Sequence, residues 1–74
     1  MYFICEVQTT NNVGTMLPPL TAETIQDAES KYHQILAYAA ISSVQKHGAI
    51  IFNDECLPIM SQCYKHGEAV NEGN

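Results

Sequence analysis

The stretch TIQDAESKYHQILAYAAI, from Thr24 to Ile41, decides the fold. Its apolar residues recur at the i, i+3, i+4 and i+7 spacing that places side chains on one face of an α-helix. They are Ile25, Ala28, Tyr32, Ile35, Leu36, Ala39 and Ala40. Thr24 is a suitable N-cap, with Thr21 as an alternative start, and Asp27 lies near the positive end of the helix dipole. Because the two serines after Ile41 favour non-helical backbone, we expect one long helix that ends there.

The segment before the helix predicts a strand followed by a loop. From Tyr2 to Thr10, the side chains of Phe3, Cys5 and Val7 fall on one face and polar side chains fall on the other. This alternation is typical of a half-buried β-strand. The next residues contain two adjacent prolines, which we expect to exclude regular structure. We therefore predict an irregular loop, rich in apolar residues, that folds over a sheet edge or a helix end.

The segment after the helix predicts a hairpin. Residues 49–52 form a short apolar strand, residues 53–56 favour a turn, and residues 57–66 return as the partner strand. Pro58 lacks an amide donor, which places that strand at a sheet edge. The sequence thus predicts an α+β fold of β-α-β-β order, with one long helix packed on a short antiparallel three-stranded sheet. We assign residues 1–67 to a single α+β domain and residues 68–74 to a flexible acidic tail.

Composition and charge narrow the class of protein. The chain has 74 residues, of which 46% are hydrophobic, so it has room for one folded domain. Its net charge is −5 and it contains no arginine. Since Lys and Arg provide most of the affinity for phosphate backbones, we expect no direct nucleic-acid binding. The three cysteines form no Cys-x-x-Cys pair, no leader pattern is present, and no apolar run is long enough to span a membrane. We therefore predict a cytoplasmic protein with reduced thiols and no membrane contact.

The C-terminal half of the predicted helix carries more apolar surface than one sheet can cover. Ile41 projects opposite Tyr32, and both Ala37 and Tyr38 lie off the main apolar face. Three candidates could cover this apolar surface: the proline-rich loop, a second copy of the chain, or a hydrophobic ligand or foreign partner. A second copy would also enlarge a core that is small in a chain of this length, so a homodimer is our first expectation.

The residues that could carry chemistry form no recognisable catalytic or metal-binding pattern. The histidines and cysteines are too scattered for the usual zinc spacing, and we predict no metal and no cofactor. Ser42 and Ser43 lie near His47, but the nucleophile-elbow pattern is absent and no acid is placed by sequence to orient the histidine. We predict no catalytic residue. The candidate residues for ligand or partner binding are His33, Tyr38, Ile41, Ser42, Ser43, His47, Tyr64 and His66.

Residues 22–67 resemble a group of small uncharacterised proteins from clostridial-type bacteria, their phages and mobile elements. The resemblance is carried by YHQILA at 32–37, SSV at 42–44 and YKH at 64–66, together with Ala39, Ala40 and His47. Similar proteins tend to have Asp and Gly in the hairpin turn, where this chain has Asn53-Asp54-Glu55-Cys56. The resemblance implies an accessory role that interferes with a host system.

These observations favour a non-enzymatic interaction protein that self-associates through its helix and inhibits a host defence protein. A second hypothesis is sequestration of a small, nucleotide-like signal on the Tyr and His surfaces. A third is a small enzyme with His33, His47 or His66 as general base.

Overall fold

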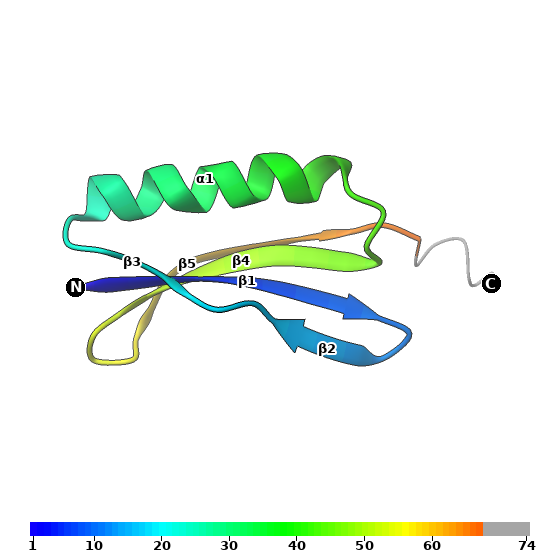
Figure 1. The fold of residues 1–74 in the computed structure, drawn as a ribbon, viewed down its shortest axis with the longest axis horizontal. Helices are drawn as coiled ribbons and strands as arrows, with labels where there is room; N and C mark the ends of the chain where they lie inside the picture. Colours follow the sequence, from blue (N-terminus) through cyan, green and yellow to red (C-terminus); the bar gives the residue numbers. More distant parts are fainter. Residues whose placement is uncertain (68–74) are drawn as a thin grey trace.

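The structure is a computed structural model that describes residues 1–67, and the predicted acidic tail lies outside the described residues. One helix packs on one side of an antiparallel sheet (Figure 1). The elements are β1 (Tyr2–Thr10), β2 (Val13–Met16), β3 (Leu20–Ala22), α1 (Ile25–Ile41), β4 (Lys46–Asn53) and β5 (Pro58–Lys65). The α+β class is confirmed. The predicted β-α-β-β order and three-stranded sheet are wrong, because two further strands precede the helix.

The helix begins and ends where its residues predict. Thr24 is the N-cap, and its side chain accepts a hydrogen bond of 3.1 Å from the backbone N–H of Asp27. Such a cap satisfies one of the free donors in the first turn. Ser42 is the C-cap, in extended backbone, and its N–H donates to the carbonyl oxygen of Ala39. The alternative start at Thr21 is excluded, since Thr21 lies in β3.

The segment predicted as an irregular loop forms both additional strands. Asn11 and Asn12 have φ angles of 52° and 67°, which the tight turn of a hairpin requires, so β2 turns back along the C-terminal half of β1. Pro18 and Pro19 then interrupt the pairing, and β3 resumes it along the N-terminal half of β1. Proline is tolerated at this place because β2 and β3 together form one edge of the sheet. The prolines therefore divide an edge strand and do not abolish it.

The remaining strands complete the sheet in the order β2-β1-β4-β5, with β3 also on β1. β4 starts at Lys46, earlier than predicted, and contains Gly48. A Cβ atom at Gly48 would lie 2.2 Å from the carbonyl oxygen of Gln62 on β5, so only glycine fits there. The turn between β4 and β5 lies where the sequence predicts it. The side chain of Asn53 closes this turn by accepting the backbone N–H of Glu55.

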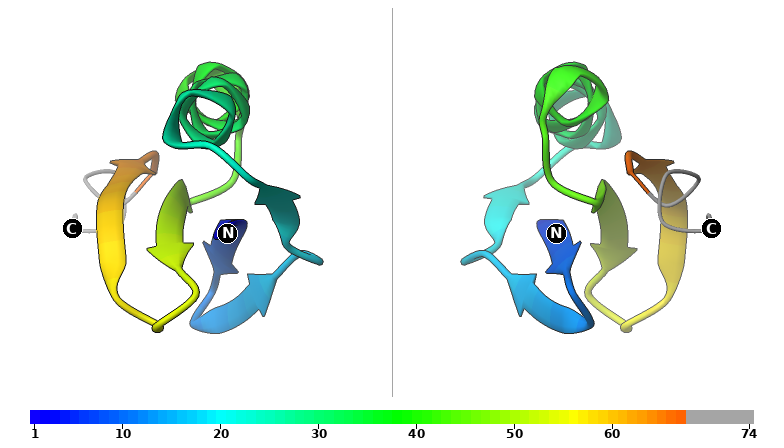
Figure 2. Two further views of the ribbon diagram at one scale, coloured as in Figure 1. Left: turned by 90° about the vertical axis from the view of Figure 1, so that its left-hand side faces the viewer. Right: turned by 90° about the vertical axis from the view of Figure 1, so that its right-hand side faces the viewer.

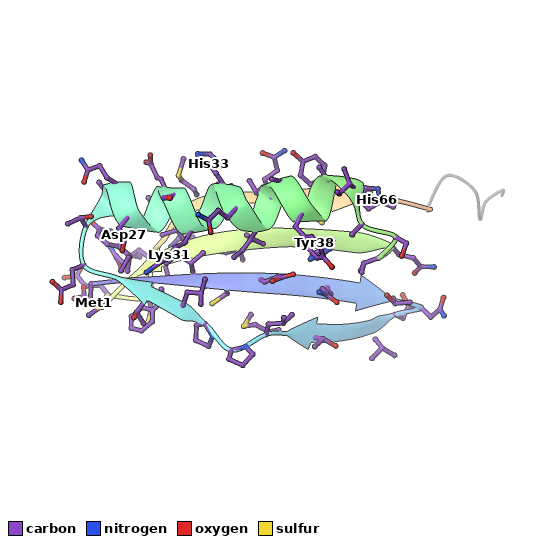
Figure 3. All side chains as sticks on the ribbon, turned by 45° about the horizontal axis from the view of Figure 1, so that its top comes forward. Met1, Asp27, Lys31, His33, Tyr38 and His66 are labelled. Atoms are coloured by element: carbon purple, nitrogen blue, oxygen red, sulfur yellow. The ribbon has the colours of Figure 1, made fainter. Side chains whose placement is uncertain are left out.

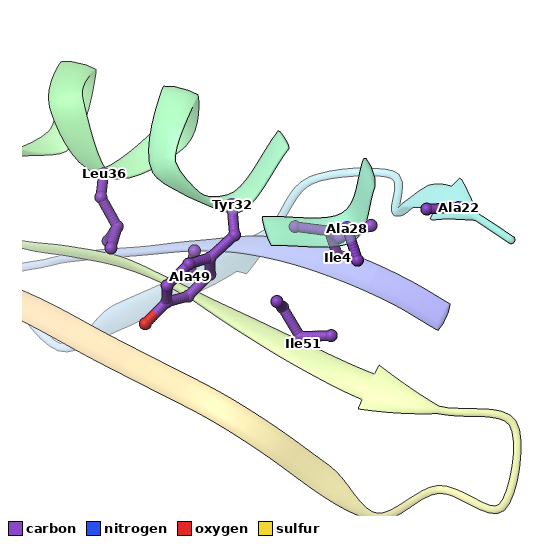
Figure 4. Close-up of a cluster of buried hydrophobic side chains, with 7 residues drawn as sticks. All are labelled: Ile4, Ala22, Ala28, Tyr32, Leu36, Ala49 and Ile51. Carbon is purple, nitrogen blue, oxygen red and sulfur yellow. The ribbon is translucent and has the colours of Figure 1, made fainter. Parts of the chain in front are cut away.

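The core lies between the helix and one face of the sheet. Its buried side chains are Ile4, Ala22, Ala28, Tyr32, Leu36, Ala49 and Ile51 (Figure 4). Views along the sheet show the helix on one side of all the strands (Figure 2). The apolar alternation in β1 is present, but α1 packs against the face that carries Ile4. Phe3, Cys5 and Val7 therefore point away from the helix.

Candidate functional site

A buried polar network joins the C-terminal end of α1 to the sheet. His47, on β4, is completely buried. Its Nδ1 atom lies 2.7 Å from Oγ of Ser42, and its Nε2 atom lies 2.5 Å from a carboxylate oxygen of Glu6 on β1. The same oxygen of Glu6 accepts a hydrogen bond of 3.2 Å from the side-chain amide of Gln8. Glu6 is itself mostly buried, with 19% of its side chain exposed.

This geometry fixes the orientation of the His47 ring. A carboxylate can only accept hydrogen bonds, so Nε2 of His47 carries the proton that faces Glu6. In the neutral ring, Nδ1 is then the acceptor and the Ser42 hydroxyl is its donor. Both ring nitrogens are satisfied inside the protein, as buried polar groups require. The network therefore holds the helix end, β1 and β4 in one arrangement.

Tyr38 and Ile41 lie on the outer surface beside this network. The ring of Tyr38 meets the His47 ring edge to face, with centroids 5.9 Å apart and an interplanar angle of 90°. Tyr38 is nevertheless 63% exposed, and Ile41 is 84% exposed. The proline-rich segment lies in the sheet and leaves both side chains uncovered, so the first of the three expected covers is excluded.

On its other side, the end of the helix is hydrogen-bonded to His66, which directly follows β5. Nε2 of His66 lies 2.8 Å from the carbonyl oxygen of Ala39, and the backbone N–H of His66 donates to the carbonyl oxygen of Gln45. The Tyr64 ring stacks beside His66, with centroids 6.3 Å apart. Burial raises the pKa of the Tyr32 hydroxyl, and the nearby Tyr64 adds to this effect. His66 thus closes the last turn of the helix by occupying a terminal carbonyl.

Most of the residues predicted from sequence as a binding site come together at this end of the helix. They are Tyr38, Ile41, Ser42, Ser43, His47, Tyr64 and His66. His33 does not join them: it is exposed farther toward the helix N-terminus and meets only the edge of Tyr32 (Figure 3). The sequence missed Glu6 and Gln8. Their position on the polar side of β1 was visible, but their proximity to His47 follows from the pairing of β1 with β4.

A second surface lies on the opposite side of the sheet. We call it the open sheet face, and its residues are Phe3, Cys5, Val7, Met16, Ile50, Phe52, Ser61 and Cys63. Two hollows flank its centre. One, of about 300 Å³, is lined by Val7 and Ile50 among others, and the second, of about 430 Å³, lies between Phe3 and Phe52. In the described part of the chain, no helix packs on this face.

Cys5 lies on the open sheet face between Phe3 and Val7 and lines the second hollow. Its neighbours bury it almost completely, and desolvation raises the pKa of its thiol. Burial in apolar surroundings keeps a thiol protonated and unreactive. Cys5 is therefore a packing residue of this face, whereas Cys56 and Cys63 are exposed.

Within residues 1–67, no three His, Cys, Asp or Glu side chains are grouped to hold a metal ion. The one helix there is too short and too polar to cross a membrane. No family model matches the chain, and neither a curated protein nor a solved structure matches it.

Proposed function

We propose that this chain is a non-enzymatic interaction protein that self-associates, and that it binds a partner protein through the surface at the C-terminal end of α1. The observation that carries the proposal is the pair Tyr38 and Ile41. Residues three apart are neighbours on a helix surface, and these two expose a large aromatic and a large aliphatic side chain together. Interface cores are enriched in such groups and depleted of charge.

The buried network makes Tyr38 a preorganised contact. The Tyr38 ring rests against His47, and Ser42 and Glu6 hold the His47 ring from both sides. A side chain that is already ordered loses less conformational entropy when a partner binds. Tyrosine is also among the residues that contribute most to binding energy at interfaces. The network thus serves binding by positioning a surface residue, with no chemical step.

The resemblance to small proteins of phages and mobile elements supports a more specific role. A protein of this kind would act by occupying a host defence protein. The surface around Tyr38 and Ile41 would supply the contact.

The proposal is tested by capture of partners from a lysate of the source organism. Immobilised wild-type protein is compared with Ile41→Glu and with the control Gln26→Glu. Both substitutions add one negative charge to an exposed position of α1, but Gln26 lies in the first turn, far from Tyr38. We expect wild type and Gln26→Glu to retain the same protein in stoichiometric amount and Ile41→Glu to lose it. Equal retention by all three, or none by wild type, would contradict the proposal.

The arrangement of Ser42, His47 and Glu6 supports a second candidate, a serine-dependent hydrolase. A serine, a histidine and an orienting acid are the parts of a nucleophilic triad. It ranks second because Ser42 Oγ also lies 3.4 Å from the backbone nitrogen of Val44, a local contact that serines commonly make where a helix has ended, and because both hollows lie on the other side of the sheet. Labelling by a fluorophosphonate probe distinguishes the two. Labelling of wild type that Ser42→Ala abolishes and His47→Gln slows would establish the enzyme, and an unlabelled wild type would remove it.

A further inference from the structure

We propose that the open sheet face is covered by the same face of a second copy, packed with its strands antiparallel to those of the first. This inference rests on the self-association in the proposed function, and it assigns the interface to the sheet and not to the helix. The helix surface around Tyr38 and Ile41 then stays available for a different partner.

The central strands β1 and β4 carry apolar side chains on both of their faces. An antiparallel sheet that is solvated on one side normally alternates apolar and polar residues. On β4, Ile51 points into the core while Ile50 and Phe52 point the other way. On β1, Ile4 is in the core while Phe3 and Val7 lie on the open sheet face. Strands with this pattern are typical of sheets that are covered on both sides.

The area of the open sheet face also favours a second copy. β4 has 8 residues, so the open sheet face is about 26 Å long and, with four strands across, about 19 Å wide. This footprint is roughly 500 Å² per copy, so a dimer would bury about 1,000 Å² in total, which is the lower limit for a stable interface. Exposed Met16 extends the face at one edge, where it lies across from Val7. A matching sheet would cover the whole face, with the usual spacing of about 10 Å between packed sheets.

The distribution of charge on the open sheet face favours a second copy in one orientation. Lys46 and Lys65 are paired across β4 and β5 at one end of the face. Asp54 and Glu55 lie in the turn at the other end, where the N-terminal amine, 3.7 Å from Asp54, offsets one of the two negative charges. The two ends are separated by about 26 Å, which exceeds the screening length of about 8 Å at physiological salt. The charges at the two ends of one copy therefore do not neutralise each other.

Only an antiparallel arrangement makes use of these charges. A two-fold axis that lies in the interface plane, perpendicular to the strands, places the lysine end of one copy over the acidic turn of the other, twice per dimer. A parallel arrangement would place lysine over lysine. The face is therefore complementary to itself in charge as well as in its apolar character.

Mass measurement by light scattering tests the inference. The chain has a mass of 8.2 kDa, so a dimer has twice that mass. Met16→Glu and Ser61→Glu change exposed residues on the two flanks of the open sheet face, and the folding of the monomer should be unaffected. We expect wild type to be dimeric and each variant to weaken dimerisation about a hundredfold or more, because a carboxylate would be buried without a partner. Ile41→Glu is the control and should remain dimeric.

The outcomes separate the two proposals. A wild type that stays at 8.2 kDa at millimolar concentration overturns the sheet dimer. Binding of a partner protein by the helix surface is then decided separately, by the capture experiment with Ile41→Glu. A dimer that dissociates in Ile41→Glu and persists in Met16→Glu moves the interface to the helix. Orientation is tested by charge reversal: Lys65→Glu and Asp54→Lys should each weaken the dimer and together restore it. If the double variant is the weakest, the antiparallel orientation is wrong.

Discussion

Replacing Gly48 by alanine should destabilise the protein strongly, for a reason that is local and geometric. The new Cβ atom would lie 2.2 Å from the carbonyl oxygen of Gln62 and 2.7 Å from Cα of Cys63. Favourable contacts between such atoms begin at about 3.5 Å, so β5 must move away from β4 by about an ångström. Both atoms belong to the backbone, and no side-chain rotation can relieve the contact. The hydrogen bonds between the two strands would be stretched beyond their normal length.

The magnitude follows from three contributions. Overpacking costs about 1–3 kcal/mol, and a weakened backbone hydrogen bond costs about 1 kcal/mol more. Alanine has less conformational freedom than glycine in the unfolded chain, and this difference stabilises the folded protein by about 0.4–1 kcal/mol. We expect a net loss of about 1–3.6 kcal/mol in the free energy of unfolding. For a domain of this size, each kcal/mol lowers Tm by about 4–8 °C.

Gly14→Ala is the matched control. Gly14 also lies in a paired strand, but the nearest atom to its added Cβ would be Oγ1 of Thr9, at 3.9 Å, which is an ordinary contact. Neither glycine has a positive φ, so the two substitutions differ only in the space available. We expect Gly14→Ala to leave Tm unchanged or to raise it slightly. Thermal unfolding followed by circular dichroism at one protein concentration is the assay, and equal Tm values for both variants would refute the reasoning.

Three further predictions concern the helix cap, the network and the buried thiol. Thr24→Ala removes the bond to the Asp27 N–H and should cost about 0.5–2 kcal/mol in urea unfolding; Thr24→Ser should restore most of it. Glu6→Ala removes the acceptor for the Nε2 proton of His47 and should lower the free energy of unfolding by about 1–3 kcal/mol. Glu6→Gln keeps an acceptor oxygen and should lose less. Equal losses in the two variants would argue against the assigned orientation of the His47 ring. Native Cys5 should react with a thiol reagent far more slowly than the two exposed cysteines. Folding raises the pKa of the Cys5 thiol. Its contribution to stability is therefore complete below the ordinary pKa of 9.0 and is lost as the pH rises through the pKa of the folded state. Urea unfolding of wild type and Cys5→Ala at several pH values from about 8 to about 10 measures this loss.

The helix was predictable because its evidence is local. The apolar spacing, the Thr24 cap and the serines after Ile41 all lie within one short segment, and each favours the same boundaries. The hairpin of β4 and β5 was predictable for the same reason. The strands β2 and β3 were missed because two adjacent prolines suggest a loop. Their pairing depends on an available edge of β1, which no local pattern reveals.

The polar network was out of reach of the sequence for a similar reason. Glu6 and His47 are 41 residues apart, and they meet because the register of β1 and β4 brings them to the same face at the helix end. The sequence did place Ser42 near His47, since five residues separate them across a short connection. The acid that completes the set could be found only once the strand pairing was known.

The divided edge strand has a consequence for the behaviour of the protein at high concentration. Unpaired strand edges can recruit further strands from other molecules and so seed fibrils. On the β2–β3 side, Pro18 and Pro19 offer no amide hydrogens, so an incoming strand finds a broken ladder. On the β5 side, Pro58 at its start, a register shift between the residues paired with Ile51 and Phe52, and Lys65 at its end interrupt the edge, but the stretch from Met60 to Lys65 pairs regularly. Growth by strand addition is thus blocked in one direction, which limits edge-to-edge association to pairs that meet through β5 and cannot extend further.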